Sequence, residues 1–563
     1  MKEKIKFQIL SNYIRNNGKI VDKAVMGVLL KENPDLKKDI KNLMSEIKEE
    51  IKIIESLSEK EILNLVKKEK IEISKKEKSN EKELIKVPGL IKGKVKTRMA
   101  PEPSKVNHIG HALSFLINYK YAKDYDGISV LRFEDTNPDN ATSEFVESMK
   151  DDLLNYIGLK PDEIIIVSDH MEKYYEMAKQ LIEKGHAYMD FSKQEELKKQ
   201  REKLLPSIFR DKSVKENLSD WNTFISGKFN EGECILRLKI KPDHKNEVMR
   251  DPVLFRMMKK THWKHSNKYC VWPLYDFENA IEDGLMGITH VFRSNEFGNK
   301  RIELQDHIRS LFNLKNPLVI QYGRFNIKGG VSKGREIKEM IDSGDYSGWD
   351  DPRLITLKAL KRRGIQKEVY EKLLIEIGLS PTQTNIDFRT LSSINRQILD
   401  PISPKYFYVD NSIEIEIKNA PNLEIKFDTF PKKNDKSRIV NTKNKFLIAK
   451  NDLDNFKDGD VVRLIDTLNF KIVNIKKKIF EFHSIDFVSF QKEKNKSNKI
   501  HFVVKTESIK VKIINEDNTQ TEGYLENSAS KLKEGDIIQA ERFGFIKLEK
   551  KNKTFYQFIF CHK

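Results

Sequence analysis

Residues 94–133, KVKTRMAPEPSKVNHIGHALSFLINYKYAKDYDGISVLRF, decide the fold of this chain. Apolar and polar residues alternate over 94–100, as in a half-buried strand, until two prolines end the pattern. A helical apolar face begins at Ile109, with Asn107 as its predicted N-cap. The continuous apolar run ISVLRF then predicts a buried parallel strand. Together they predict a βαβ unit, whose ligands bind beyond the carboxyl ends of the strands.

The start of the predicted helix places His108 and His111 on either side of Gly110. A helix N-terminus has free amide groups and a partial positive charge, so it attracts anions. Histidines three apart share one helical face and can donate hydrogen bonds to the same anion, while the glycine leaves room for a group close to the backbone. This pattern predicts a phosphate site. From spacing alone, half of a metal site and two ordinary capping histidines are alternatives.

Composition narrows the class of protein. The 563 residues have a net charge of +18 and are 38% hydrophobic, which predicts a folded chain of about three to five domains. The charge favours an anionic partner such as nucleic acid, although a lysine-rich genome would produce the same balance. The three cysteines form no CxxC pair, so no disulfide framework or all-cysteine zinc site is expected. Without a signal sequence or an apolar run of membrane-spanning length, we expect a cytoplasmic protein.

The texture of the sequence changes along the chain. Residues 5–68 show helical spacing and are followed by a highly charged stretch, which we interpret as a helical appendage and a linker. After about residue 396, short apolar runs alternate with Gly, Asn and Asp, which predicts antiparallel β-barrels or a sandwich.

Five motifs resemble the class I aminoacyl-tRNA synthetases. TRMAPEPSKVNHIGHA is similar to their HIGH signature, and LRFEDTNP, YDFENAIEDGLMGITHVFR, VSKGR and GWDDPRL follow in the order of the glutamyl and glutaminyl branch. The β-rich end of the chain, with GDIIQAERFGF, resembles the archaeal-type glutamyl enzymes. The resemblance implies a multidomain α/β plus β fold with these parts: a helical appendage and linker (1–90), two halves of a Rossmann-type catalytic domain (91–168 and 280–325), an inserted tRNA acceptor-binding domain (169–279), the lysine loop with a helical subdomain (326–395), and β-barrel anticodon-binding domains (396–563).

The family resemblance assigns ATP chemistry to the histidine motif. In this family the two HIGH histidines and the lysine of a later loop stabilise the α-phosphate of ATP, which implies catalytic roles for His108, His111 and Lys333. Such chemistry depends on positioning and positive charge. ATP would bind as its Mg²⁺ complex, and no structural zinc is expected. The implied ATP-binding residues are Pro101, Glu102, Pro103, His108, Gly110, His111, Ser332 and Lys333.

The amino-acid pocket implied by the resemblance consists of Arg98, Glu134, Tyr275 and Arg293. Arg293 follows the THV stretch, where glutamyl enzymes have an arginine for the side-chain carboxylate and glutaminyl enzymes have a neutral residue. Glu134 carries a negative charge suited to the substrate's ammonium group. A buried arginine that faces a neutral amide would lose its partner, at a cost of about 3 to 5 kcal/mol. The TNP ending of the LRFEDTNP motif is closer to glutaminyl enzymes and keeps that alternative open.

The predicted tRNA contacts lie in the second half of the chain: Arg362, Arg363, Arg396, Gln539 and Arg542. GWDDPRLITLKALKRRG is read as a helix capped by Asp351 that ends before Gly364. His262 and His265 invite a metal interpretation, but no third ligand with suitable spacing follows.

The prediction is therefore a glutamate–tRNA ligase that uses ATP, L-glutamate and tRNA(Glu), with charging of tRNA(Gln) left open. A protein partner for the N-terminal helices is a further expectation, and no membrane association is expected. Three alternatives remain: a glutaminyl enzyme, a non-catalytic tRNA-binding paralogue, and a metal-dependent hydrolase built on the histidine pairs.

Overall fold

The computed structural model describes residues 2–15, 20–33, 39–57, 61–62, 65–66, 84–328, 334–430 and 437–563. These residues form two compact units, Met1–Glu83 and Leu84–Lys563. Among the described residues of the first unit, three amphipathic helices bury one face each around a core that includes Ile9, Leu29 and Ile47. The three are α1 (Lys2–Arg15), α2 (Asp22–Glu32) and α3 (Ile40–Glu55).

The second unit begins with parallel strands. One parallel ladder consists of β1 (Lys96–Met99), β2 (Ile128–Phe133) and β3 (Glu163–Ile166). Another consists of β8 (His290–Ser294) and β9 (Leu318–Tyr322). The amide of Thr289 donates to the carbonyl of Lys96 (2.9 Å), which brings β8 beside β1. All of β2 after its first residue is buried, as expected for a strand covered on both faces.

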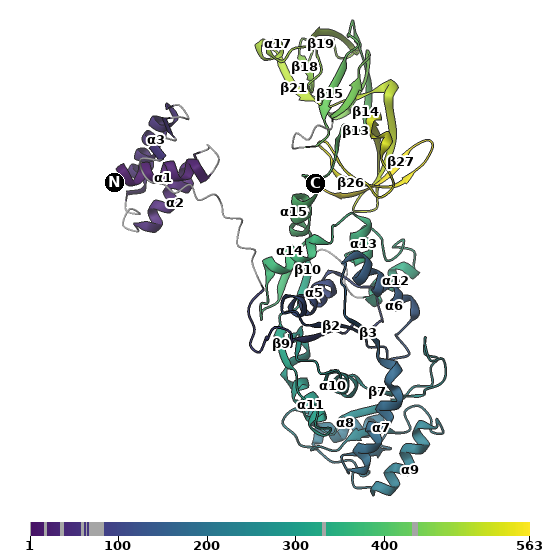
Figure 1. Ribbon diagram of the computed structural model, residues 1–563. Helices are drawn as coiled ribbons and strands as arrows, with labels where there is room; N and C mark the ends of the chain where they lie inside the picture. Colours follow the sequence, from purple (N-terminus) through teal and green to yellow (C-terminus); the bar gives the residue numbers. More distant parts are fainter. Residues whose placement is uncertain are drawn as a thin grey trace. The chain divides into compact units, whose positions relative to one another are not determined.

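Helix α5 (Ile109–Asp124) connects β1 to β2, so it follows the carboxyl end of β1 (Figure 1). The Thr97 hydroxyl donates to the carbonyl of Asn118 (2.7 Å), and the Asn118 side chain donates to the carbonyl of Phe292 (2.9 Å). These two bonds fix α5 against β1 and β8. The arrangement is consistent with a Rossmann-type domain.

The other elements around this sheet come mostly from later in the chain. They are α6 (Ser143–Lys150), the π-helical turn η2 (Asp151–Tyr156), α10 (Tyr275–Leu285), η5 (Asn295–Phe297), α11 (Gly298–Ser310), β10 (Phe325–Lys328), α12 (Gly334–Asp342), α13 (Leu357–Arg362), α14 (Glu368–Ile377), β11 (Thr384–Asp387) and α15 (Phe388–Leu399).

Helix α13 corrects one local prediction. Its N-cap is Thr356, whose hydroxyl accepts from the amide of Ala359 (3.1 Å), and not Asp351. Asp351 instead accepts from Ser347 and Arg353 in the preceding turn. An Asp-Pro pair is therefore used here to build a turn, although it also matches the pattern of a helix start.

A separate antiparallel sheet with its own core lies between β3 and α10. Trp221, Phe255 and Trp272 are buried at its centre. The elements are η3 (Val167–His170), α7 (Met171–Glu183), β4 (Ala187–Asp190), α8 (Gln194–Lys203), α9 (Val214–Ile225), β5 (Ile235–Leu238), η4 (Glu247–Met249), β6 (Val253–Met257) and β7 (Val271–Pro273).

The C-terminal part has two seven-stranded sheets, drawn in green to yellow in Figure 1. The first has the order β12-β25-β26-β27-β23-β24-β13 and the second β21-β18-β19-β20-β14-β17-β22. Each surrounds its own apolar core. The strands of these two sheets, together with the separate antiparallel pair of β15 and β16, are β12 (Lys405–Tyr406), β13 (Tyr408–Asp410), β14 (Ser412–Lys418), β15 (Glu424–Asp428), β16 (Ser437–Asn441), β17 (Lys445–Ala449), β18 (Val461–Leu464), β19 (Asn469–Asn474), β20 (Ile479–Ser484), β21 (Lys496–Ile500), β22 (Val503–Val504), β23 (Ser508–Ile514), β24 (Gln520–Glu526), β25 (Ile537–Ala540), β26 (Gly544–Lys551) and β27 (Tyr556–His562). Short helical elements join them: α16 (Lys450–Leu453), α17 (Phe487–Lys492), η6 (Lys505–Glu507) and η7 (Asn527–Lys531). Among the described helices of the whole chain, none has the length and apolar character that a membrane span needs.

Candidate active site

A cavity of about 830 Å³ opens beside the start of α5. Its lining includes nine of the residues predicted from the sequence: Arg98, Pro101, Glu102, His108, Gly110, His111, Glu134, Tyr275 and Arg293. Pro103 is buried nearby but does not line the cavity, whereas Ser332 and Lys333 lie outside the described residues. The chain is described again from Gly334, where an added Cβ would lie 2.9 Å from the Cβ of Lys105, another cavity residue.

The imidazoles of the two HIGH histidines are oriented by hydrogen bonds to backbone amides at the start of α5. His108, and not Asn107, is the N-cap of α5, because its Nδ1 accepts from the amide of Gly110 (3.0 Å). The amide of His108 in turn donates to Nδ1 of His111 (3.2 Å). With Nδ1 acting as the acceptor, the proton of each neutral ring is on Nε2. Each imidazole therefore offers one N–H donor.

Burial keeps both imidazoles uncharged. The pKa of His108 is lowered from 6.5 to about 4, first by burial and then by the positive charges of Lys105 and Arg324. The pKa of His111 is lowered well below 6.5 by burial, by His108 and by the same two cations. At neutral pH the site therefore combines two neutral N–H donors, the helix N-terminus and nearby cations, which is an environment suited to phosphate.

Gly110 has a local role in addition to the predicted one. A Cβ at this position would lie 2.8 Å from Cε1 of His108 and 3.4 Å from the carbonyl oxygen of Phe325. The missing side chain therefore makes room for the capping imidazole of the same protein. The sequence predicted that this space would admit a ligand group.

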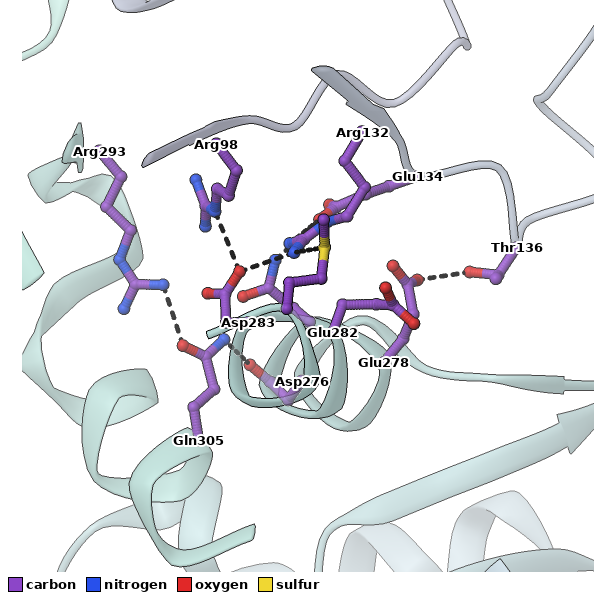
Figure 2. A network of polar contacts seen from close by, with 12 residues as sticks. Arg98, Arg132, Glu134, Thr136, Asp276, Glu278, Glu282, Asp283, Arg293 and Gln305 are labelled. Atoms are coloured by element: carbon purple, nitrogen blue, oxygen red, sulfur yellow. Dashed lines mark hydrogen bonds and ion pairs between the residues drawn. The ribbon is translucent and has the colours of Figure 1, made fainter. Parts of the chain in front are cut away.

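A chain of buried charges joins β1, β2 and α10 (Figure 2), and two of its members, Arg98 and Glu134, line the cavity. Asp283 on α10 accepts from Arg98 on β1 (3.2 Å) and from Arg132 on β2 (2.7 Å). Arg132 also forms an ion pair with Glu134 (2.8 Å). Two positive and two negative side chains thus compensate each other away from water, as buried charges require.

Glu134 is held at the cavity by a second contact, because the Asn279 amide donates to the same oxygen that Arg132 contacts (2.8 Å). The backbone amide of Glu134 also donates to the carbonyl of Pro101 (2.9 Å), which ties the end of β2 to the loop before α5. The predicted carboxylate is therefore fixed in direction before any substrate arrives.

Arg293 enters the cavity from β8, 5% exposed. It donates to Gln305 on α11 (3.0 Å), and Gln305 in turn donates to Asp276 (3.2 Å). A side-chain hydrogen bond joins Arg293 to Tyr275, and burial lowers the pKa of the guanidinium. Burial is also the main cause that raises the pKa of the Tyr275 phenol. A buried cation and a protonated phenol thus lie together in the cavity.

Sequence reasoning missed the polar face of α10. Glu278, Asn279, Glu282 and Asp283 are all buried there, although helices usually bury apolar side chains. Glu282 accepts from Tyr174 (2.6 Å) and contacts His170 (2.9 Å), and the pKa of His170 is raised by that hydrogen bond. The sequence YDFENAIEDGL contained a usable indication, because its four polar residues lie three or four apart on a helix that is flanked by two buried strands.

The second histidine pair stabilises a packing contact. His262 contacts the carbonyl oxygen of Asp135 through Nε2 (2.9 Å), and its Nδ1 accepts from the amides of Lys264 and His265. The Asp135 carboxylate accepts from Trp263 and Ser168. Both ring nitrogens of His262 are thus in use. In the part of the chain that the structure describes, no group of three His, Cys, Asp or Glu side chains is arranged to hold a metal.

Models of known protein families match most of the chain. A family model described as "tRNA synthetases class I (E and Q), catalytic domain" matches residues 94–401, and two models of the anti-codon binding domain of the same group match 403–487 and 476–549. The chain belongs to the class I tRNA synthetases of the E and Q group. It is therefore an aminoacyl-tRNA synthetase, as the resemblance implied.

Curated relatives of this synthetase match it along almost its whole length. A glutamate–tRNA ligase from Pyrococcus abyssi is 36% identical over 565 residues, covering 98% of both chains. Another from Methanococcus maripaludis is 34% identical over 564 residues, covering 100% of both. A solved glutamate tRNA ligase from Elizabethkingia meningosepticum, in complex with its amino acid, is 18% identical, covers 55% of this chain and 70% of its own, and has a TM-score of 0.38.

The predicted tRNA contacts of the synthetase have varied surroundings. Arg363 is 5% exposed and donates to the carbonyl of Cys561 (3.1 Å) on β27, while Arg362 pairs with Glu549 (2.6 Å) on β26. Arg396 is exposed on α15. Gln539 is half-buried on β25, and Arg542 is exposed but bonded to Asp452 (3.1 Å). Arg362 and Arg363 thus connect the helical region after the cavity to the C-terminal sheets.

Proposed function

We propose that this synthetase is a glutamate–tRNA ligase. A carboxylate oxygen of L-glutamate attacks the α-phosphorus of ATP, the bond to the β-phosphate bridging oxygen breaks, and glutamyl-AMP and pyrophosphate result. A hydroxyl of the 3′-terminal adenosine of tRNA(Glu) then attacks the glutamyl carbonyl carbon, and AMP leaves. Charging of tRNA(Gln) with glutamate is an open extension of the same activity.

Arg293 is the observation that carries the amino-acid assignment. It is a buried cation in the same cavity as His108 and His111, in a chain whose full-length relatives are named glutamate–tRNA ligases. A buried guanidinium favours a carboxylate over a neutral amide, because the amide leaves the charge without an ionic partner. This supports glutamate over glutamine, and no finding favours the glutaminyl, non-catalytic or hydrolase alternatives.

The proposed catalytic residues are His108, His111 and Lys333. The Nε2–H donors of the two neutral imidazoles suit the α-phosphate oxygens, on which negative charge accumulates in the transition state. Lys333 is proposed from its motif and would supply a full positive charge to the same phosphate. The other proposed ATP contacts are Pro101, Glu102, Pro103, Gly110 and Ser332, and ATP would carry its own Mg²⁺.

The proposed glutamate contacts surround the chain of buried charges. Glu134 would receive the ammonium group and Arg293, beside Tyr275, the side-chain carboxylate. Arg98 already forms an ion pair with Asp283, and it would keep this partner while it contacts the bound glutamate. The ammonium group and the side-chain carboxylate of glutamate have opposite charges, and the cavity offers a fixed group of the opposite sign for each.

The remaining parts of the chain suggest how tRNA is held. We infer that the inserted sheet between β3 and α10 binds the acceptor end and that the two C-terminal sheets form barrels that read the anticodon. Proposed contacts are Arg362, Arg363, Arg396, Gln539 and Arg542. The three N-terminal helices are proposed to bind tRNA or a protein partner. Because the proposed activity charges tRNA, we propose that the protein works in the cytoplasm.

Aminoacylation with labelled amino acids tests the proposal. The full chain should charge tRNA(Glu) with glutamate and not with glutamine, and both amino acids should also be tried on tRNA(Gln). Charging with glutamine alone would replace the proposal by the glutaminyl alternative. No charging, together with tight tRNA binding, would support the non-catalytic paralogue.

A further inference from the structure

Helix α10 places a second carboxyl group beside the one proposed to receive the ammonium group. Glu278 lines the cavity and is 2% exposed. Its Oε2 accepts a hydrogen bond from the Thr136 hydroxyl (2.6 Å), and Oε1 has no hydrogen-bond partner within the described residues. No cation among those residues forms an ion pair with it, which is unusual for a buried carboxyl group.

Two neighbouring hydrogen bonds fix Glu278 relative to Glu134 (Figure 2). Asn279 donates to Glu134 (2.8 Å), and Thr136, two residues further along the chain, donates to Glu278. The segment after β2 is thereby joined to consecutive residues of α10. The guanidinium of Arg132 favours the ionised form of Glu278, but it pairs with Glu134 and Asp283. Glu134 thus has a positive partner, whereas no ion pair of Glu278 is found within the described part of the chain.

Electrostatics then favours one charge and one proton on these two carboxyl groups. Burial disfavours the ionised form of Glu278, and the negative charge of Glu134 disfavours it further, so the pKa of Glu278 is raised well above 4.5. Other titratable groups face this site from the neighbouring strands and helices: Arg98, Arg132, His170, Tyr174, Glu282 and Asp283. Asp283 is compensated by two arginines, and Glu282 by His170 and Tyr174.

We propose that Glu278 is a positioning residue that keeps a proton while the cavity is empty and releases it when the ammonium group of the amino acid reaches Glu134. The O–H bond of the Glu278 carboxyl breaks, the proton passes to solvent through the cavity, and the ammonium group supplies the missing positive charge. This inference rests on the proposed function, because it takes an amino acid as the ligand. It adds that binding of that amino acid is coupled to the loss of one proton.

The pH dependence of the glutamate KM in aminoacylation is the first test. If binding releases one proton, the KM of the full-length enzyme should fall by about tenfold per pH unit while Glu278 is protonated in the free enzyme, and then level off. Titration of wild-type protein with glutamate by calorimetry, in two buffers of different ionisation enthalpy, should report about one proton released at the lower pH. This second readout needs no variant.

Glu278→Gln removes the proton and keeps the shape of the side chain. Its KM for glutamate should be independent of pH and should be well above the wild-type value at the pH where the wild type levels off, because the amide imitates the protonated carboxyl. The kcat at saturating glutamate should change little. Glu282→Gln, one turn further along α10, should keep the tenfold slope but level off at lower pH, because the charge of Glu282 also raises the pKa of Glu278.

Glutarate is glutamate without its ammonium group. Its binding shows whether the released proton depends on the ammonium group or comes from other titrating groups. Between about pH 6.5 and pH 8, its binding should release no proton from the wild type. An unchanged KM slope in Glu278→Gln, or equal proton release with glutamate and glutarate, would overturn the inference. A wild-type enzyme that does not charge tRNA with glutamate would instead refute the proposed function, and the calorimetric proton count would still decide the role of Glu278.

Discussion

The imidazole rings of His108 and His111 stack with their centroids 3.9 Å apart. Each ring accepts a backbone amide proton through Nδ1, so neither can be protonated there without losing the bond that orients it. The pair therefore combines helix capping with the presentation of two Nε2–H groups. Local folding and phosphate recognition depend on the same atoms.

The first prediction concerns the charge of His108. Burial and the cations nearby hold its pKa at about 4 instead of 6.5. Between these values the unfolded chain binds a proton that the folded chain does not, so the free energy of unfolding should decrease as the pH falls from 6.5 toward 4. A ¹³C NMR titration of labelled histidine, assigned with His108→Asn, would measure the pKa. A value near 6.5 would contradict the buried, neutral ring.

Gly110→Ala should separate activity from stability. The new Cβ would collide with Cε1 of His108, so the ring must move, and we expect adenylate formation to fall by about 100-fold. The thermal midpoint should change little, because alanine favours the helix. Gly27→Ala on α2 is the control, since nothing lies within 4 Å of its added Cβ. Pyrophosphate exchange in the presence of tRNA measures the effect, and full activity in Gly110→Ala would refute the steric argument.

Arg293→Gln should weaken the preference for glutamate. Removing the buried cation is expected to lower kcat/KM for glutamate by about two to four decades while the value for glutamine falls less. Lys338→Gln, which removes an exposed ion pair with Asp342, should leave both values unchanged. Equal losses for both amino acids would show that Arg293 supports the cavity without reading the side-chain charge.

Arg363→Met should lower the stability of the connection between α13 and the C-terminal sheets. Its buried guanidinium donates to carbonyls on both sides, those of Pro352 (3.3 Å) and Cys561 (3.1 Å), and we expect a loss of about 1 to 3 kcal/mol in unfolding free energy. Calorimetry measures that loss. Comparing the salt dependence of tRNA binding with that of the exposed Arg396→Met variant tests whether Arg363 also contacts phosphate.

The regular elements were predictable where one physical constraint dominated. The run ISVLRF became β2 over the predicted residues, because a strand buried on both faces must be continuously apolar. The short C-terminal runs likewise became strands, for example IKVKIIN within and just beyond β23. The capping residue of α5 was not predictable, since both Asn107 and His108 offer an acceptor and only the backbone path decides between them.

The charged side of the cavity could not be derived from periodicity. Its partners come from β1, β2 and α10, which are far apart in the sequence, and a buried carboxylate has the same letter as an exposed one. Glu278 illustrates the limit: its burial and its lack of a cation follow only from the packing of α10 against the end of β2. The family resemblance supplied Glu134 and Arg293 but did not indicate the residues that fix their direction.

The bridge that Asp283 makes between Arg98 and Arg132 limits how this cavity could be redesigned. Replacing any one of the three leaves an uncompensated charge in the protein interior, so single substitutions that aim at a new amino acid would mostly yield misfolded enzyme. Useful libraries would vary the three positions together and keep their charges balanced. Selection for new substrates would then have to change these positions together, because variants with only one of the substitutions would not survive the selection.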